Sequence, residues 1–147
     1  MDISRDKSVC QVISRLSEAL AKDGPVKADG TWGSFAPLLA YHISKTLNRP
    51  LLYVSANIEE ADNIFDDLMV FAGKGIDIFP VWETQDKFAD ATDEIGAQRT
   101  KIAMGLARLK KTEPLIISTC VQALNQPVPK PGRLNESGLS LKLNATI

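Results

Sequence analysis

Three short apolar runs, separated by longer stretches with helical periodicity, constrain the fold of this 147-residue chain more than any other feature. The runs are residues 50–55, 76–79 and 115–119, and they are rich in β-branched and aromatic side chains. Runs of this length and composition are typical of strands buried on both faces of a parallel sheet. Because helical patterns separate them, right-handed crossovers follow, and we predict an α/β fold with a doubly wound parallel sheet. We expect residues 50–55 to be the central strand.

The helical patterns have recognisable ends. The first runs from Val9 to Leu20, and a later one covers residues 58–71, with Asn57 and Glu60 as a capping box and Gly73 at its end. The last runs from Ile95 to about Lys111. Its polar positions are interpreted as a solvated, mildly basic face, with contact to nucleic acid or an acidic partner as the alternative; they include Gln98, Arg99, Lys101, Arg108 and Lys110.

A glycine loop lies between a predicted strand at residues 26–28 and a helix that Ser34 is expected to cap, with Pro37 in its first turn. Strand, loop and helix in this order are typical of a phosphate-binding loop, in which glycines precede a Lys-Ser/Thr pair that binds phosphate and magnesium. Here Phe35 and Ala36 occupy the places of that pair. We therefore expect a vestigial site without cofactor, metal or catalytic residues, formed by Gly30, Thr31, Trp32, Gly33, Ser34, Phe35 and Ala36.

Two tryptophans allow two interpretations each. Trp32 could fill the vacated phosphate pocket, which we favour because tryptophan is mostly buried, or it could be exposed and mark a docking surface. Trp82 is expected to anchor the end of its strand in the core. The polar connection that follows it, to Asp93, is longer than most, and long connections are often functional or mobile.

Composition excludes several classes of function. Lys and Arg total 17 against 18 Asp and Glu, a net charge of -1 that makes direct binding to nucleic acid an unfavoured function. No apolar window approaches the ~20 residues of a membrane span, and the first residues lack the apolar core of a secretion signal, so we expect a cytoplasmic protein. Cys10 and Cys120 are predicted to be buried thiols, and His42 is given no catalytic role.

The end of the chain differs in composition. Prolines 127, 129 and 131 indicate a linker, and the alternating Leu139-Ser140-Leu141-Lys142-Leu143 is typical of a half-buried strand. We predict an N-terminal helix in residues 1–24, an α/β domain with the degenerate loop in 25–126, and a linker with the first strand of a second domain in 127–147.

The most specific segment, Ile78-Phe79-Pro80-Val81-Trp82-Glu83-Thr84, resembles the strand and "P-x-W-E-T" turn of the UvrB-like region of bacterial transcription-repair coupling factors. Residues 49–54 and 115–124 match the same family, and the likeness covers about residues 26–143. In UvrB the loop is an intact phosphate loop, whereas in coupling factors it is degenerate, as it is here. The family usually continues with Leu-Pro-Tyr-Asp, whereas residues 85–90 read Gln-Asp-Lys-Phe-Ala-Asp, which indicates a divergent member.

The resemblance implies a non-catalytic module of a large translocase that displaces stalled RNA polymerase and recruits UvrA for nucleotide excision repair. ATP and magnesium would be bound by motor domains of that parent protein, and the partners would be UvrA and RNA polymerase. Two alternatives remain open from the residues: a free-standing α/β protein-interaction domain and, less favoured because the loop lacks its lysine, an ATP-binding enzyme domain.

Overall fold

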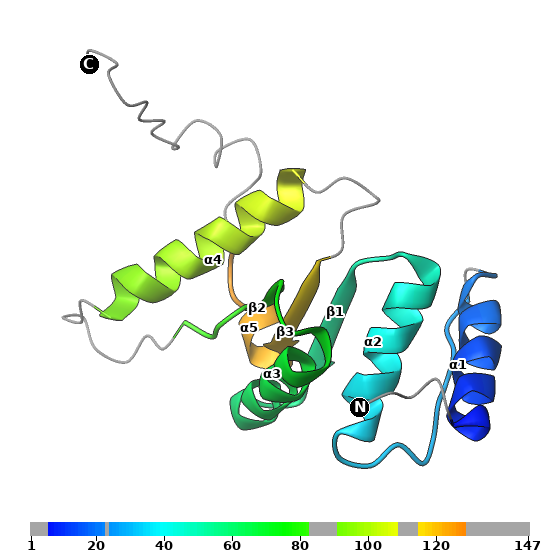
Figure 1. Ribbon diagram of the computed structural model, residues 1–147. Coiled ribbons are helices and arrows are strands. Elements are labelled where there is room, and N and C mark those ends of the chain that lie inside the picture. The colour runs from blue at the N-terminus through cyan, green and yellow to red at the C-terminus, as the bar shows by residue number, and fades with distance from the viewer. Residues whose placement is uncertain (1–5, 23, 83–90, 109–114, 129–147) are drawn as a thin grey trace.

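The computed structural model describes residues 6–22, 24–82, 91–108 and 115–128 as an α/β fold around a small parallel sheet (Figure 1). Strands and helices alternate from β1 onward, as the sequence predicts. The elements in chain order are α1 (Lys7–Leu20), α2 (Phe35–Leu47), β1 (Leu51–Ser55), α3 (Ile58–Ala72), β2 (Ile76–Ile78), α4 (Ala91–Arg108), β3 (Ile116–Cys120) and α5 (Val121–Leu124).

The sheet has the order β1-β3-β2, and both strand pairs are parallel. The central strand is therefore β3, and the prediction that residues 50–55 form the central strand is wrong. All five residues of β3 are buried, whereas Leu52 and Val54 of β1 are 52% and 40% exposed. A short apolar run shows that a strand is largely buried, but its place in the sheet depends on the crossovers, which periodicity does not reveal.

Polar residues in β3 are accommodated by hydrogen bonds to backbone carbonyls. Ser118 Oγ donates to Ala61 O at 2.8 Å, and Thr119 Oγ1 donates to Phe79 O at 3.0 Å. Both side chains are completely buried, so an unpaired hydroxyl at either place would be costly. These bonds tie the central strand to α3 and to the residue after β2.

Helices lie on both sides of the sheet (Figure 1). On one side Ile64 and Leu68 of α3 pack with Ile76 and Ile116. Successive residues of a strand point to opposite faces, so Ile117 points away from α3, and it clusters with Ile102 of α4. The parallel α/β architecture is thus confirmed for the described residues.

The ends of α3 follow the predicted capping pattern. Asn57 Oδ1 accepts from the Glu60 N–H at 2.9 Å, and Glu60 Oε2 accepts from the Ala56 N–H at 3.1 Å. Gly73 ends the helix with a φ of 76°, a conformation that costs glycine little. The reciprocal bond reaches Ala56 and not the N-cap residue itself, but it satisfies the backbone at the same turn.

The segment before the glycine loop differs from its prediction. Residues 26–28 form no strand, and the chain there runs without regular structure between α1 and α2. Three residues with a central lysine supply little apolar area to a sheet, and Lys27 instead pairs with Asp29 at 3.2 Å in solvent. The predicted strand at 139–143, the connection at 83–90 and the end of the last helix beyond Arg108 lie outside the described residues.

No helix among the described residues is long and apolar enough to cross a membrane.

Candidate functional site

The glycine loop lies directly before α2 and is shaped by two residues with positive φ. Gly30 has a φ of 79° and Gly33 a φ of 52°, both in the region that favours glycine. The Phe35 N–H donates to Trp32 O at 3.2 Å, which closes a turn across Gly33 and Ser34. The loop therefore has a defined turn that leads into the helix, as its glycine spacing predicts.

Ser34 does not cap α2 with its side chain, contrary to the prediction. It occupies the N-cap position, but its φ of -65° and ψ of -5° are helical. Its Oγ donates instead to Asp67 Oδ1 of α3 at 2.9 Å. A residue with helical backbone angles points its side chain away from the first free N–H groups, and the nearby carboxylate is a stronger acceptor.

The loop faces α3 across an open cavity of about 690 Å³, which we call the loop–α3 groove. Tyr53 of β1 forms part of its lining, and three carboxylates come from α3. The described residues that line it are Thr31, Gly33, Ser34, Ala36, Tyr53, Glu60, Asn63, Ile64, Asp66 and Asp67. Among the described residues, no Lys, Arg or His lines the groove, so the described lining beside the glycine loop carries negative charge.

The titration of Tyr53 reflects that charge. Burial raises the pKa of Tyr53 above its ordinary value, and the neighbouring carboxylates of Glu60 and Asp67 raise it further. Both effects disfavour the phenolate. A phosphate group brought into the groove would experience the same repulsion, without a lysine to offset it.

Trp32 is 84% exposed, so the favoured prediction that it fills the vacated pocket is wrong. It lies between Thr31 and Gly33, which line the groove, while its own ring does not. The positive φ of Gly30 and Gly33 turns the loop so that the side chain between them projects into solvent. The alternative interpretation of Trp32, an exposed ring at a docking surface, remains.

Phe35 and Ala36, the residues in place of the Lys-Ser/Thr pair, are half-buried at the start of α2, and Pro37 is fully buried. An aromatic ring and a methyl group in these positions pack against the protein and offer neither a cation nor a metal ligand. This arrangement supplies no chemistry for phosphate transfer.

Backbone carbonyls and the Phe79 ring surround Arg99, which the sequence analysis interpreted as part of a solvated helix face. Arg99 is 3% exposed and donates to Pro80 O at 2.5 Å, Ala123 O at 3.3 Å and Pro127 O at 3.5 Å. Its guanidinium lies 4.2 Å from the centre of the Phe79 ring, and burial lowers its pKa. The prediction of exposure is wrong for Arg99, whereas Lys101 and Arg108 are exposed as expected.

Gln98, another predicted polar position of this helix, and Gln126 also bond to the backbone at and after β2, whereas Lys110 lies outside the described residues. Gln98 Nε2 donates to Ile78 O at 3.1 Å. Gln126 joins both backbone groups of Trp82, accepting from its N–H at 2.6 Å and donating to its carbonyl at 2.8 Å. Trp82 is half-buried, and its ring lies so near α4 that a Cβ at Gly96 would be 3.9 Å from Trp82 Cη2. These hydrogen bonds connect β2 and the residues that follow it to α4 and to Gln126, just after α5. No sequence motif indicates them.

The cysteines and the histidine bring no further site. Cys120 is buried as predicted, but Cys10 is exposed on α1, so the prediction of two buried thiols is wrong for Cys10. His42 is half-buried beside Tyr41, and burial lowers its pKa. Within the described ranges, no group of three or more His, Cys, Asp or Glu is placed to hold a metal ion.

Comparisons with protein-family models, with curated proteins and with solved structures find no significant match to this chain.

Proposed function

We propose that this chain is a non-catalytic, UvrB-like module of a transcription-repair coupling factor. One observation carries the proposal: a glycine loop in the place of a phosphate loop ends in Phe35 and Ala36 and opens onto the carboxylates of α3. A loop of this shape without its cation is what the family resemblance implies. The chain would serve the parent protein through contacts and not through chemistry.

The arrangement of elements supports this proposal. The degenerate loop precedes a helix, parallel strands follow, and helices lie on both sides of the sheet, although no strand forms directly before the loop. The finer part of the proposal is that these elements belong to a doubly wound, P-loop-type domain. Pro80, Val81 and Trp82, the described part of the resembling turn, are held by Arg99 and Gln126, so this segment has a structural reason for its composition.

The wider role belongs to the parent protein. Its motor domains would bind ATP and magnesium and act on stalled RNA polymerase, and it would recruit UvrA. We place the protein in the cytoplasm, because bacterial transcription takes place there. Direct contact of this chain with DNA is not part of the proposal, since its charge is balanced.

One other function has a specific observation in its favour. The 84% exposure of Trp32 favours a protein-interaction domain, whether or not that domain belongs to a repair protein. An ATP-binding enzyme domain is disfavoured by the carboxylates of the groove.

The reading frame beyond the codon for Ile147 in the source genome tests the coupling-factor proposal. A continuing frame that encodes a second domain and, further on, helicase motifs with an intact phosphate loop would support it. A stop codon directly after Ile147 would contradict it and leave the free-standing interaction domain as the better account.

A further inference from the structure

We propose that residues 139–143 pair with the outer edge of β1 as a fourth, antiparallel strand of the sheet. The occupant of that edge is thus a segment of this chain, Leu139-Ser140-Leu141-Lys142-Leu143. The inference goes beyond the proposed function and does not rest on it. It gives the alternating segment a place in the described sheet, whereas the sequence analysis predicts that the segment begins a second domain.

The outer edge of β1 is open among the described residues. β1 pairs with β3 alone and therefore ends one side of the sheet (Figure 1). The Leu51 N–H donates to Leu115 O at 2.8 Å, on the side of β3. Because the backbone groups of successive residues point to opposite sides of a strand, the N–H and C=O groups of Leu52 and Val54 point away from β3. No other described residue bonds to these four groups, so they can pair with an added strand.

The side chains of the same two residues leave an apolar surface uncovered. Leu52 and Val54 are 52% and 40% exposed. The register pairs Leu52 with Ile117, so both side chains lie on the α4 side of the sheet. Ile117 is buried in a cluster with Ile102 of α4, but neither Leu52 nor Val54 belongs to a buried cluster. Apolar side chains on a neighbouring strand would cover part of this surface.

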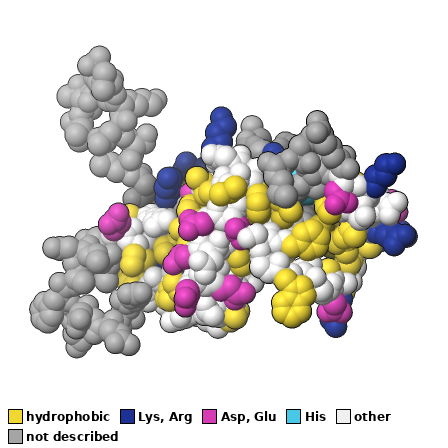
Figure 2. All heavy atoms as spheres, turned by 60° about the horizontal axis from the view of Figure 1, so that its bottom comes forward, with side chains coloured by type: hydrophobic (Ala, Val, Ile, Leu, Met, Phe, Trp, Pro, Cys, Tyr) yellow, Lys and Arg dark blue, Asp and Glu magenta, His cyan; other side chains and the backbone are white. Residues whose placement is uncertain are grey.

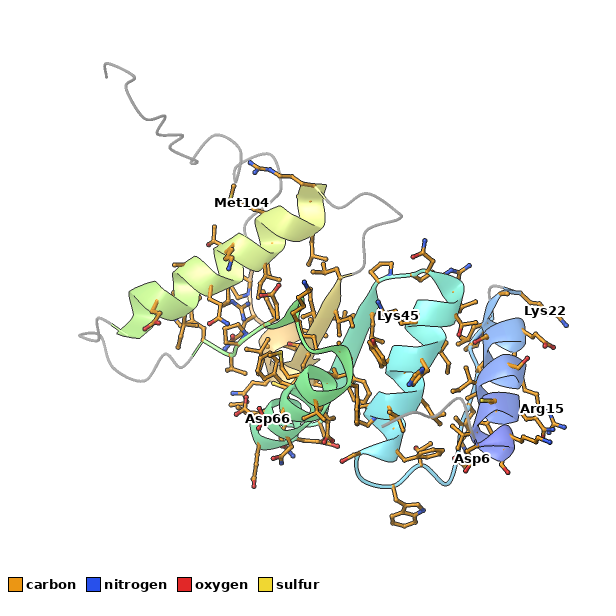
Figure 3. The ribbon with its side chains drawn as sticks, viewed as in Figure 1. Asp6, Arg15, Lys22, Lys45, Asp66 and Met104 are labelled. Atoms are coloured by element: carbon orange, nitrogen blue, oxygen red, sulfur yellow. The ribbon has the colours of Figure 1, made fainter. Side chains whose placement is uncertain are left out.

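The opposite face of β1 is already covered. Tyr41 of α2 packs in one cluster with Leu51 and Tyr53 and with residues of α3. The outer surface of α3 is acidic: Figure 2 shows a group of Asp and Glu side chains in the middle of the face brought forward. Asp66 is exposed on the outer side of α3 (Figure 3). The uncovered apolar surface of β1 therefore lies at its edge and on the α4 side.

The edge of β2 is less suited to an added strand. β2 has 3 residues, whereas β1 has 5. The Phe79 N–H donates to Ser118 O of β3 at 2.9 Å, so the backbone of Ile78 points to the outer side of β2. There Ile78 O already accepts from Gln98 of α4 at 3.1 Å. Of the two edges, that of β1 is the longer and the more accessible.

The alternating segment fits this edge in length and pattern. It has 5 residues, as β1 has, and its leucines lie on one face of a strand with Ser140 and Lys142 on the other. Residues 129–138 connect it to Val128 and can span about 33 Å when extended. Gln126 bonds to Trp82 after β2, so the linker must cross about three strand spacings, or about 15 Å, to reach the far side of β1.

The direction of the added strand follows from the place where β3 ends. Cys120 is paired with Ser55, so β1 and β3 end at the same edge of the sheet, and α5 begins there. A linker returning from this end enters the new strand beside Ser55 and runs antiparallel to β1, which needs no crossover helix. Antiparallel edge strands occur on many otherwise parallel sheets. Because the segment belongs to the same chain, its effective concentration at the edge is high.

Nuclear magnetic resonance of the isotope-labelled chain tests the proposal. We expect nuclear Overhauser effects between residues 139–143 and residues 51–55. We also expect the N–H groups of Leu52 and Val54, which we call the edge amides, to exchange with solvent at least about tenfold more slowly than in an unstructured peptide.

The triple variant Leu139→Ser, Leu141→Ser, Leu143→Ser removes the apolar face of the segment. We expect it to abolish these Overhauser effects and to accelerate exchange of the edge amides by about tenfold. The amides of Leu51 and Tyr53 face β3 and serve as the internal control, with a change of less than about twofold expected.

The matched control variant is Leu134→Ser, which removes a leucine from the same part of the chain but outside the alternating segment. We expect it to leave the exchange of the edge amides unchanged. Circular dichroism of each variant reports whether it folds. The Overhauser effects are measured in the unchanged chain, so the test is decisive even if the triple variant does not fold.

Absence of these Overhauser effects, or rapid exchange of the edge amides in the unchanged chain, would overturn the proposal. Slow exchange that survives the triple variant would also overturn it, because another segment would then cover the edge. Slow exchange that depends on protein concentration would do the same, because a second copy of the chain would then be the occupant. None of these results bears on the reading-frame test of the proposed function.

Discussion

Replacing Arg99 by Met tests whether the hydrogen bonds of this buried side chain stabilise the packing of α4 against the residues after β2 and against α5. The guanidinium makes two close hydrogen bonds, to Pro80 O and Ala123 O, a longer one to Pro127 O, and a contact with the Phe79 ring. Methionine keeps an unbranched apolar chain in place of the arginine stem, but it is shorter and leaves these carbonyls without their donor.

The expected loss follows from these contacts. Two hydrogen bonds from a charged donor contribute about 1.5–3 kcal/mol each, and the ring contact adds about 1 kcal/mol. Removing a buried cation also removes its desolvation cost, which offsets part of the sum. We therefore expect Arg99→Met to lower the free energy of unfolding by about 3 kcal/mol, a fall in Tm of about 10 °C for a chain of this size.

Urea denaturation followed by circular dichroism measures the change. Lys101→Met is the matched control, since it removes the same charge from an exposed position of the same helix, and we expect it to alter stability by less than about 0.5 kcal/mol. If Arg99→Met lowers the free energy of unfolding by less than about 1 kcal/mol, the reasoning is refuted, because the hydrogen bonds of Arg99 would then contribute little to stability.

Two further predictions concern local features. Asn57→Ala removes the side-chain acceptor for the Glu60 N–H at the start of α3. We expect urea denaturation to show a free energy of unfolding lower by about 1 kcal/mol. An unchanged midpoint would mean that water replaces the cap. Burial lowers the pKa of His42 below 6.5, so between the lowered value and 6.5 the unfolded chain binds a proton that the folded chain does not. The contribution of His42 to the stability of the fold is therefore complete above this pH window and declines as the pH falls through it. We compare the urea midpoints of unfolding at about pH 7.5 and about pH 5.5, and we expect the midpoint to fall less in His42→Gln than in the unchanged chain. An equal fall in the variant would argue against this role of His42.

The elements that the sequence predicts well are those with local signals. The helix at α3 has both its apolar spacing and its caps in adjacent residues, Asn57 and Gly73, and it forms as expected. The three strands also form where short apolar runs predict them. These features depend on residues within one turn or one strand, so a single sequence contains the information.

Features that depend on distant partners could not be predicted in this way. Arg99 is buried where the carbonyls of Pro80, Ala123 and Pro127 converge on it, and these belong to two parts of the chain, 19 and 24–28 residues away. Its spacing from Ile95 and Ile102 places Arg99 on their face of α4, but a charged residue there is expected to be buried only if its acceptors are known, and these are distant in sequence. The position of β3 between its partners depends likewise on two crossovers and not on the composition of the strand.

The candidate site could be predicted from the sequence only in part. The missing lysine of the glycine loop is visible in the sequence, as is the acidic composition of α3. That the two face each other across one groove is a tertiary fact, marked by the bond between Ser34 and Asp67, which lie 33 residues apart. The exposure of Trp32 likewise follows from the turn geometry of the loop, which overrides the usual burial of tryptophan.

The most direct test of the central claim, that the glycine loop has lost its nucleotide chemistry, is a calorimetric titration of the chain with ATP in the presence and absence of magnesium. The account predicts no saturable heat of binding up to about 1 mM ATP under either condition. Saturable binding that requires magnesium and is weakened by substitutions of Gly33 or Ser34 would contradict it.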